Sequence, residues 1–295
     1  MNKNEEYVDP DSLSPKPEKA YKNLSFLNSA EARPIRVLCE LSEPAVRLRR
    51  EGVRNTIVFF GSARNPAPER EEQLLAEMSE HESAPQLSEE AGRQLEARRR
   101  QIERAVTYYR FARDLARRLT EWSDSQEDPD RKFAICSGGG PGIMEAANRG
   151  AREAGGRSVA FGISLPFEQK LNPYCDEELS FDFHYFFLRK YWFLYHAKAL
   201  IVFPGGFGTF DELFEMLTLV QTRKTTKHIQ ILLVGRDFWE STLNFSNLVE
   251  WGTISPEDLA LFRIVDSMDE AFDLLVHPFE TGQIRPNGGP ALMPE

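Results

Sequence analysis

A short glycine-rich segment ends in a carboxylate that could do chemistry. The segment PGGFGTFDE, residues 204–212, follows the apolar run 199–203, and its glycines allow a ligand to approach the backbone closely. Glu212 could lie beside a bound sugar, at the mouth of a phosphate-binding turn. Thr209 and Glu212 are also spaced as a helix capping box, in which Glu212 would have no chemical role. The spacing favours neither interpretation over the other.

A second glycine-rich segment, SGGGPGIMEAANRG at residues 137–150, lies between an apolar run and a helical pattern. The free N–H groups and the positive dipole end at the start of a helix bind phosphate, and we favour this role over that of a tight turn. The segment does not match the GxGxxG dinucleotide fingerprint, and the next expected strand, 158–165, ends without an acid for a ribose hydroxyl. It also lacks the GK[ST] of a P-loop, which disfavours ATP hydrolysis.

Apolar runs that alternate with helical patterns position both segments. The expected strands are 56–60, 133–136, 158–165, 199–203, 229–234 and 262–265, and the expected helices are 143–154, 211–222 and 268–275. This alternation predicts an α/β fold: a Rossmann-like, doubly wound parallel sheet with helices on both faces, in a single domain. Such sheets bind ligands at the carboxyl ends of their strands, where both glycine segments begin.

The polar beginning of the chain differs from the segment that follows it. Residues 1–30 contain three prolines and no sustained helical or strand period, which predicts a flexible N-terminal arm. Apolar residues between Pro34 and Gly52 suggest helical turns, and Pro44 is expected to bend or restart them.

The main domain is expected to span residues 31–280, with a C-terminal tail at 281–295. A highly charged segment at 66–122 has apolar residues at helical spacing and is expected to form a helical excursion from this domain. Its basic residues alternate with Glu96 and Glu103, so we expect a solvated surface rather than a nucleic-acid site.

The composition limits the classes of partner. The chain has 295 residues and a formal net charge of −10, which argues against a protein that neutralises nucleic-acid phosphates. Its three cysteines, Cys39, Cys136 and Cys175, are far apart and form neither a metal-binding pattern nor a disulfide framework. No apolar run approaches the roughly 20 residues that span a bilayer, and the first residues lack the apolar core of a signal peptide. We therefore expect a cytoplasmic protein with no membrane or nucleic-acid partner.

At these segments the chain resembles a known family. PGGFGTFDE matches the PGGxGTxxE signature of the LOG proteins, the cytokinin riboside 5′-monophosphate phosphoribohydrolases, whose bacterial relatives include nucleotide 5′-monophosphate nucleosidases. Further segments look like those of the larger bacterial members, within a resemblance that covers roughly residues 25–275: GSAR at 61–64, SGGGPGIMEAANRGA at 137–151, LPFEQKLNPY at 165–174 and FFLRK at 186–190. Members were long labelled lysine decarboxylases, but the sequence lacks the SxHK-like context of a pyridoxal-phosphate lysine.

The resemblance implies roles for particular residues. It places the catalytic or substrate-orienting arginine at Arg189, with Lys190 beside it, and the catalytic glutamate at Glu212. The implied phosphate contacts are Gly205, Gly206, Gly208 and Thr209, and the further residues of the nucleotide-binding cleft are Gly139, Gly140, Ser62, Arg64 and Glu145. For Arg64 a surface salt bridge stays open as an alternative, and for Glu145 a solvated charge on a helix.

The implied reaction is hydrolysis of the N-glycosidic bond of a nucleoside 5′-monophosphate, AMP or N6-modified AMP foremost, to free base and ribose 5-phosphate. Glu212 could stabilise the oxocarbenium-like sugar or accept a proton from the attacking water. Arg189 could grip a phosphate or ribose oxygen and keep Glu212 ionised. His184 and His196 are expected to be ordinary histidines rather than acids for the leaving base. No metal or cofactor is expected.

The main alternative is a nucleotide or cofactor carrier or sensor without turnover, resembling the molybdenum-cofactor carrier proteins. A carrier has no reason to retain both Arg189 and Glu212 at this spacing. The family also implies an active site at a dimer interface, so we expect at least a homodimer, with a role in cytokinin production or nucleotide salvage.

Overall fold

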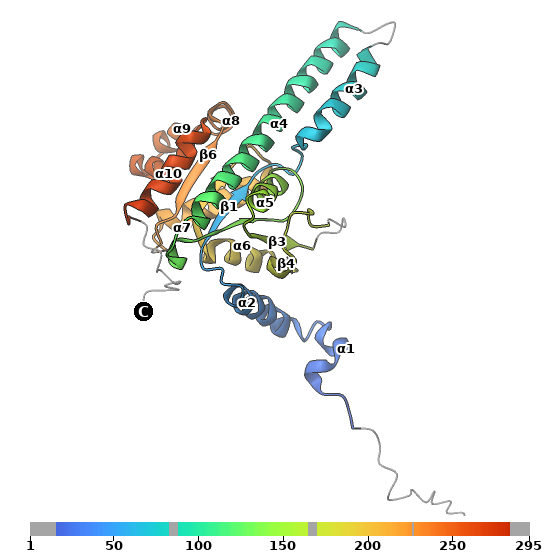
Figure 1. Ribbon diagram of the computed structural model, residues 1–295, viewed down its shortest axis with the longest axis vertical. Helices are drawn as coiled ribbons and strands as arrows, with labels where there is room; N and C mark the ends of the chain where they lie inside the picture. Colours follow the sequence, from blue (N-terminus) through green and yellow to red (C-terminus); the bar gives the residue numbers. More distant parts are fainter. Residues whose placement is uncertain (1–15, 83–87, 165–169, 226, 284–295) are drawn as a thin grey trace, which may run out of the picture. The chain divides into compact units, whose positions relative to one another are not determined.

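The structure, a computed structural model, describes residues 16–82, 88–164, 170–225 and 227–283 (Figure 1). The chain divides into two compact units, Met1–Glu43 and Pro44–Glu295. Parts of the arm, of the predicted strand 158–165, of the segment 165–174 and of the tail lie outside the described residues.

The described part of the predicted arm contains two short helical segments, η1 (Ala20–Lys22) and α1 (Leu24–Leu27). Asn23 begins α1, because its side-chain oxygen accepts a hydrogen bond of 3.0 Å from the N–H of Phe26. The arm itself stays a prediction. Helix α2 (Arg33–Arg50) then runs through Pro44 without interruption. The helix therefore does not restart at Pro44, because one proline removes a single backbone hydrogen bond and the flanking turns keep theirs.

The strands of the described residues form one parallel sheet in the second unit, with the order β4-β3-β2-β1-β5-β6-β7. The strands are β1 (Thr56–Phe60), β2 (Ala134–Ser137), β3 (Ser158–Ile163), β4 (Ser180–Phe183), β5 (Ala197–Val202), β6 (Gln230–Val234) and β7 (Arg263–Val265). The α/β fold with a doubly wound parallel sheet is thus confirmed. Within the described ranges, the predicted strand ends agree to within two residues, and β4 is the strand that was missed.

The helices of this unit alternate with the strands. They are α3 (Glu71–Glu82), α4 (Glu89–Asp124), α5 (Ile143–Glu153), α6 (Phe186–Tyr195), α7 (Phe207–Gln221), α8 (Arg236–Thr242), α9 (Phe245–Glu250) and α10 (Met268–Glu280). Shorter 3-10 helices are η2 (Pro68–Arg70), η3 (Pro129–Arg131), η4 (Glu177–Leu179) and η5 (Pro256–Leu261).

Helices cover both faces of the sheet, as predicted. Neighbouring residues of a strand point to opposite faces. Phe59 of β1 lies in the core cluster that also contains side chains of α4, α5 and α10. Phe60 faces the other way and packs edge-to-face against Phe193 of α6, with 4.8 Å between the ring centroids. The central strand β1 is therefore buried on both sides, which explains its uniformly apolar side chains after Thr56.

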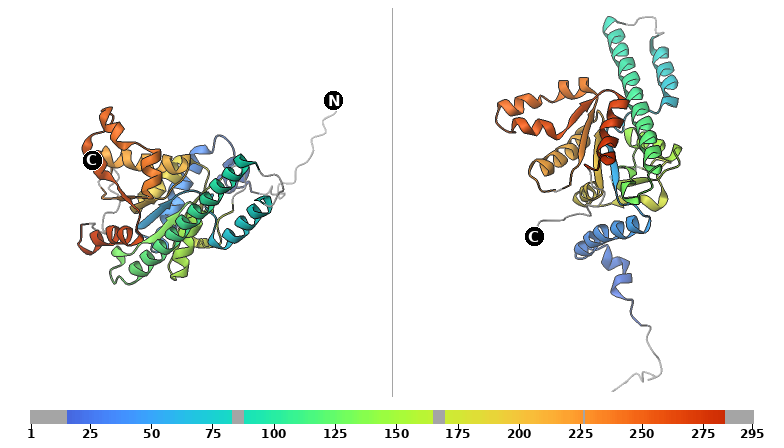
Figure 2. Two further views of the ribbon diagram at one scale, coloured as in Figure 1. Left: turned by 90° about the horizontal axis from the view of Figure 1, so that it is seen from above. Right: turned by 60° about the vertical axis from the view of Figure 1, so that its left-hand side comes forward.

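The described residues of the charged segment 66–122 form η2, α3 and α4, but only the first part of the segment extends from the domain, so the expected excursion is wrong for the second part of α4. Helix α3 lies beside the first part of α4, and the two extend together past the sheet (Figures 1 and 2). A small separate cluster of Met78, Ile102 and Val106 joins them, with leucines of both helices around it. The second part of α4 packs into the main core through residues such as Leu115 and Leu119.

Helices α4 and α5 pack so closely that glycine is needed at their contact. A Cβ atom at Gly150 would lie 2.0 Å from the carbonyl oxygen of Arg113. We expect Gly150→Ala to lower the free energy of unfolding by about 1–3 kcal/mol, because the helices must move apart. Scanning calorimetry should then show a Tm about 2–4 °C lower for each kcal/mol lost.

Gly208→Ala is the matched control for this substitution. A Cβ atom at Gly208 would have no atom within 4 Å, and the residue lies inside α7, where alanine is favoured over glycine. Its Tm should stay the same or rise. An unchanged Tm for Gly150→Ala would show that the two helices can separate at no cost.

Candidate active site

Three loops meet at the carboxyl ends of neighbouring strands. They follow β2, β1 and β5, which lie side by side in the sheet. The chain leaves β1 toward β2 on one side of it, while β5 lies on the other side, so the crossovers diverge here. Ligands of doubly wound sheets bind at this kind of switch point. The two predicted glycine segments and the GSAR segment are therefore brought together.

Ser62 joins both glycine loops through its backbone. Its N–H donates to the carbonyl of Pro204 at 3.0 Å, and its carbonyl accepts from the N–H of Ile143 at 3.1 Å. Gly142 has a φ of 73°, and a Cβ atom there would lie 2.3 Å from the Ser62 carbonyl oxygen, so only glycine fits. The side-chain oxygen of Ser62 accepts from the N–H of Arg64, whose own side chain is exposed. Contact of Ser62 and Arg64 with substrate stays a prediction.

The first glycine loop offers backbone donors at the start of α5. Gly142 is the N-cap of this helix and has no side chain to cap its first turn, in which only the N–H of Ile143 is known to be used, by the Ser62 carbonyl. The N–H of Gly139 is already used, because it donates to the Ser137 hydroxyl at 3.0 Å. Over the described stretches of the chain, the N–H of Gly140 has no hydrogen-bond partner. Gly140 therefore suits an anion better than Gly139 does.

The second glycine loop passes into α7 four residues earlier than predicted, at Phe207 rather than at Asp211. The N-cap is Gly206, whose carbonyl accepts from the N–H groups of Thr209 and Phe210. Thr209 is therefore inside the helix, and the capping-box interpretation of Thr209 and Glu212 is wrong. A helix that begins at Phe207 places Glu212 in its second turn, where it cannot cap.

The three predicted glycines of this loop differ in their surroundings. A Cβ atom at Gly205 would lie 2.2 Å from the Thr209 hydroxyl, so the buried Thr209 packs beneath the loop. A Cβ atom at Gly206 or Gly208 would meet no atom within 4 Å. The backbone at these two positions is open to a ligand, and Phe207 between them is 96% exposed.

Arg189 belongs to α6, and its side chain reaches the first glycine loop. Its Nε donates to the carbonyl of Phe161 at 2.9 Å, and its guanidinium packs over the ring of Phe193 at 5.2 Å. A Cβ atom at Gly138 would lie only 2.7 Å from Nη2 of Arg189. Burial lowers the pKa of Arg189, while the charge of Glu212 raises it, and the group stays cationic. The guanidinium is therefore fixed at Nε, and its Nη2 lies beside Gly138 of the loop.

Glu212 is a partly buried carboxyl group beside two cations. Burial raises the pKa of Glu212 to about 7, although Lys190 and Arg189 lower it. In the part of the chain that the structure describes, no hydrogen bond or ion pair holds the Glu212 carboxylate. Both protonation states are accessible near neutral pH, which suits a group that transfers protons.

Lys190 connects α6 to α7. Its Nζ forms ion pairs with Asp211 at 2.8 Å and with Glu215 at 2.9 Å, on either side of Glu212 in the sequence. Lys190 thus fixes the helix that carries Glu212 against the helix that carries Arg189. Its predicted contact with substrate is not tested by this arrangement.

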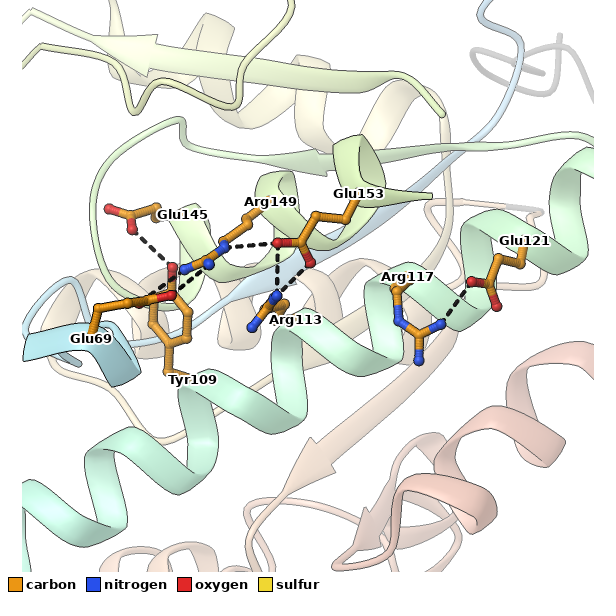
Figure 3. A network of polar contacts seen from close by, with 8 residues as sticks. All are labelled: Glu69, Tyr109, Arg113, Arg117, Glu121, Glu145, Arg149 and Glu153. Carbon is orange, nitrogen blue, oxygen red and sulfur yellow. Dashed lines mark hydrogen bonds and ion pairs between the residues drawn. The ribbon is translucent and has the colours of Figure 1, made fainter. Parts of the chain in front are cut away.

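Glu145 points toward α4 instead of standing free on the helix surface. The Tyr109 hydroxyl donates to its carboxylate at 2.8 Å (Figure 3). In the same network, Arg149 binds Glu69 through both terminal nitrogens and Glu153 through Nε. The alternative of a solvated charge is therefore wrong for Glu145, and its role toward substrate stays a prediction.

Sequence reasoning missed a buried amide network beneath the first glycine loop. The Ser137 hydroxyl donates to Oδ1 of Asn148 at 2.7 Å, and Nδ2 of Asn172 donates to the same oxygen at 2.9 Å. All three residues lie inside segments that drew attention for their glycines or their family resemblance. Polar residues at fixed positions beside a glycine loop were the available signal.

The two candidate histidines, His184 and His196, lie in different places. His196 lies at the amino end of β5, opposite the glycine loops, where its Nδ1 is 2.9 Å from the carbonyl of Arg54. Its location agrees with the expectation of an ordinary histidine. His184 follows β4 and is exposed. Within the described ranges, no three His, Cys, Asp or Glu residues are placed to hold a metal, and no helix has the length and apolarity of a membrane span.

Comparisons with known proteins give one family model, relatives of low identity and solved structures of similar fold. Residues 144–275 match the family model described as possible lysine decarboxylase. A probable cytokinin riboside 5′-monophosphate phosphoribohydrolase, LOG4 of Oryza sativa subsp. japonica, is 27% identical over 60% of this chain and 74% of its own length. LOG3 of Arabidopsis thaliana, a cytokinin riboside 5′-monophosphate phosphoribohydrolase, is 32% identical over 41% and 56%, respectively. The solved structure of a Moco carrier protein from Chlamydomonas reinhardtii is 14% identical, with a TM-score of 0.43 over 78% of this chain and 99% of that one.

Proposed function

We propose, from the premise that this chain is a relative of the LOG phosphoribohydrolases, that it hydrolyses nucleoside 5′-monophosphates to free base and ribose 5-phosphate. One observation carries the proposal. Arg189 of α6 and Glu212 of α7 lie near enough for each charge to act on the pKa of the other. They do so beside two glycine loops that present backbone N–H groups at helix starts.

The loops would hold the 5′-phosphate, and Glu212 would act at the sugar. The bond between C1′ and the base nitrogen breaks with its electron pair leaving on the base, so positive charge develops on the ribose. An ionised Glu212 stabilises this charge and accepts a proton from the attacking water. The water oxygen bonds to C1′ as the bond to the base breaks, and the proton that Glu212 takes from the water passes to the departing base. Base and ribose 5-phosphate are the products.

Arg189 would orient the substrate. Its Nε is occupied by the Phe161 carbonyl, which leaves the terminal nitrogens for a phosphate or ribose oxygen. Its charge also favours the ionised form of Glu212. The same residue thus binds substrate and adjusts its neighbouring base.

We place AMP and N6-modified AMP first among the substrates. The plant relatives are named for cytokinin riboside 5′-monophosphates, which carry an N6-modified adenine. A role in cytokinin production or in nucleotide salvage would follow from the base that is preferred. We also propose at least a homodimer, because three large aromatic side chains near the loops are exposed: Phe186, Phe187 and Phe207. The cytoplasmic location expected from the sequence stays a proposal.

The phosphate should be essential for turnover. Adenosine lacks the group that both loops would bind, so its kcat/KM should be at least about 10²-fold lower than that of AMP. The measurement is chromatographic release of free base from AMP, GMP, CMP, UMP, isopentenyladenosine monophosphate and adenosine. The control is Glu212→Ala with each substrate. Equal rates for AMP and adenosine would refute the role of the loops in binding the 5′-phosphate. Saturable binding without any base release would favour a carrier or sensor.

A further inference from the structure

Asn172 holds two consecutive carbonyl groups of the first glycine loop. Its Nδ2 lies 3.1 Å from the carbonyl oxygen of Gly139 and 3.0 Å from that of Gly140. Its own backbone N–H also donates to the Gly139 carbonyl, at 2.8 Å. The Asn172 amide is oriented, because its Oδ1 accepts from the N–H of Tyr174 at 3.1 Å. Both loop carbonyls therefore point to the chain segment between β3 and β4.

This orientation determines where the loop presents a donor. A trans peptide directs its C=O and its N–H to opposite sides. With the Gly139 carbonyl held by Asn172, the N–H of Gly140 points away from Asn172. This N–H has no hydrogen-bond partner among residues 16–82, 88–164, 170–225 and 227–283. Pro141, which follows, has no N–H to compete for a ligand.

Two more buried side chains fix the same loop. Asn148 is fully buried, and its Oδ1 accepts from both Asn172 and the Ser137 hydroxyl. The Ser137 hydroxyl in turn accepts from the N–H of Gly139. The N–H of Gly139 and the carbonyls of Gly139 and Gly140 are thus paired, while the N–H of Gly140 has no partner among the described residues. These hydrogen bonds favour one conformation of the loop, although Nδ2 of Asn148 is buried and has no hydrogen-bond partner among the described residues.

We propose that Asn172 is a positioning residue of the hydrolase, which turns the Gly140 peptide so that its N–H and the start of α5 receive the 5′-phosphate of the substrate. The proposal rests on the proposed function, because it takes the phosphate as the ligand of this loop. Asn172 itself touches no reacting atom. It acts through Gly139 and Gly140.

Replacing Asn172 should affect binding more than the chemical step. The phosphate is bound equally in the ground state and in the transition state, so a weaker phosphate site raises KM and leaves kcat nearly unchanged. We expect Asn172→Ala to raise the KM for AMP at least about tenfold, with kcat within about threefold of wild type. Asn172→Asp, which keeps the shape and the acceptor for Tyr174, should do the same and serves if the alanine variant does not fold.

Asn55→Ala is a matched control. Asn55 is also a buried asparagine, 3% exposed, and its Nδ2 donates to the carbonyl of Lys132 at 3.0 Å. It lies next to the amino ends of β1 and β2, away from the glycine loops. Loss of a buried amide should lower the Tm of both alanine variants, but Asn55→Ala should keep the wild-type KM.

The outcomes separate this inference from the proposed function. Steady-state kinetics would be combined with calorimetric titration of AMP. If wild type hydrolyses AMP and Asn172→Ala has the KM and AMP affinity of Asn55→Ala, the positioning role is refuted. If wild type binds AMP without hydrolysis and only the Asn172 variants lose about tenfold in affinity, Asn172 positions the loop for phosphate binding, but the proposed hydrolysis is refuted.

Discussion

Glu212→Gln should lower kcat for base release from AMP by about 10²–10⁴-fold, with a much smaller change in KM. Glutamine keeps the size and polarity of the side chain, but it neither carries negative charge near C1′ nor accepts a proton from water. The carboxylate acts on charge that develops as the bond breaks, so its loss should fall on kcat. Release of adenine under saturating AMP measures the effect.

Thermal stability provides the first control for this variant. Because the pKa of Glu212 in the folded protein lies above the ordinary 4.5, the fold binds an extra proton between about pH 4.5 and 7 and loses stability as the pH rises through that range. At pH 8, Glu212→Gln should therefore have an equal or higher Tm than wild type. Glu240→Gln removes an exposed carboxylate of α8, paired to Arg236 at 2.8 Å, and should leave kcat unchanged. Full activity of Glu212→Gln would refute the assigned role.

Arg189→Met should lower kcat/KM by about 10²–10³-fold and also change the pH profile. Wild-type kcat/KM is expected to fall about tenfold per pH unit below pH 7, because only ionised Glu212 accepts the proton. Arg189 lowers the pKa of Glu212. Removing its charge should therefore move the acidic limb of the profile, the fall of kcat/KM at low pH, to higher pH.

Arg189→Lys separates the two contributions of this residue. Lysine keeps the positive charge but lacks the planar fork that holds the Phe161 carbonyl and a substrate oxygen together. Its kcat/KM should fall nearly as far, while the acidic limb should stay near that of wild type. A limb at the same pH in all three proteins would contradict the electrostatic link between Arg189 and Glu212.

The sheet could be predicted because its central strands are buried on both faces. The apolar run Thr56–Phe60 has no polar interruption and matches β1 residue for residue. Strand β4 (Ser180–Phe183) was missed because its sequence SFDF is short and carries an exposed aspartate at the sheet edge. Helix α7 starts earlier than expected. Glycine is unfavourable inside helices, so Gly206 and Gly208 indicated a turn where the first turn of α7 lies.

The candidate site was predictable in part. Arg189 and Glu212 came from a family motif, and the structure brings them together beside the glycine loops. Partners that are distant in sequence could not be predicted. The hydrogen bonds from Tyr109 to Glu145 and from Asn172 to the first glycine loop produce no periodic pattern in the sequence, because each depends on how separate elements pack.

The most direct test of hydrolysis by Arg189 and Glu212 is the stoichiometry of the products from AMP. Wild-type protein would be incubated with AMP, adenine quantified by chromatography and ribose 5-phosphate by mass spectrometry. Equal amounts of both products, absent with Glu212→Gln, are the predicted result. AMP that is bound and recovered intact, or adenosine with inorganic phosphate in place of adenine, would contradict it.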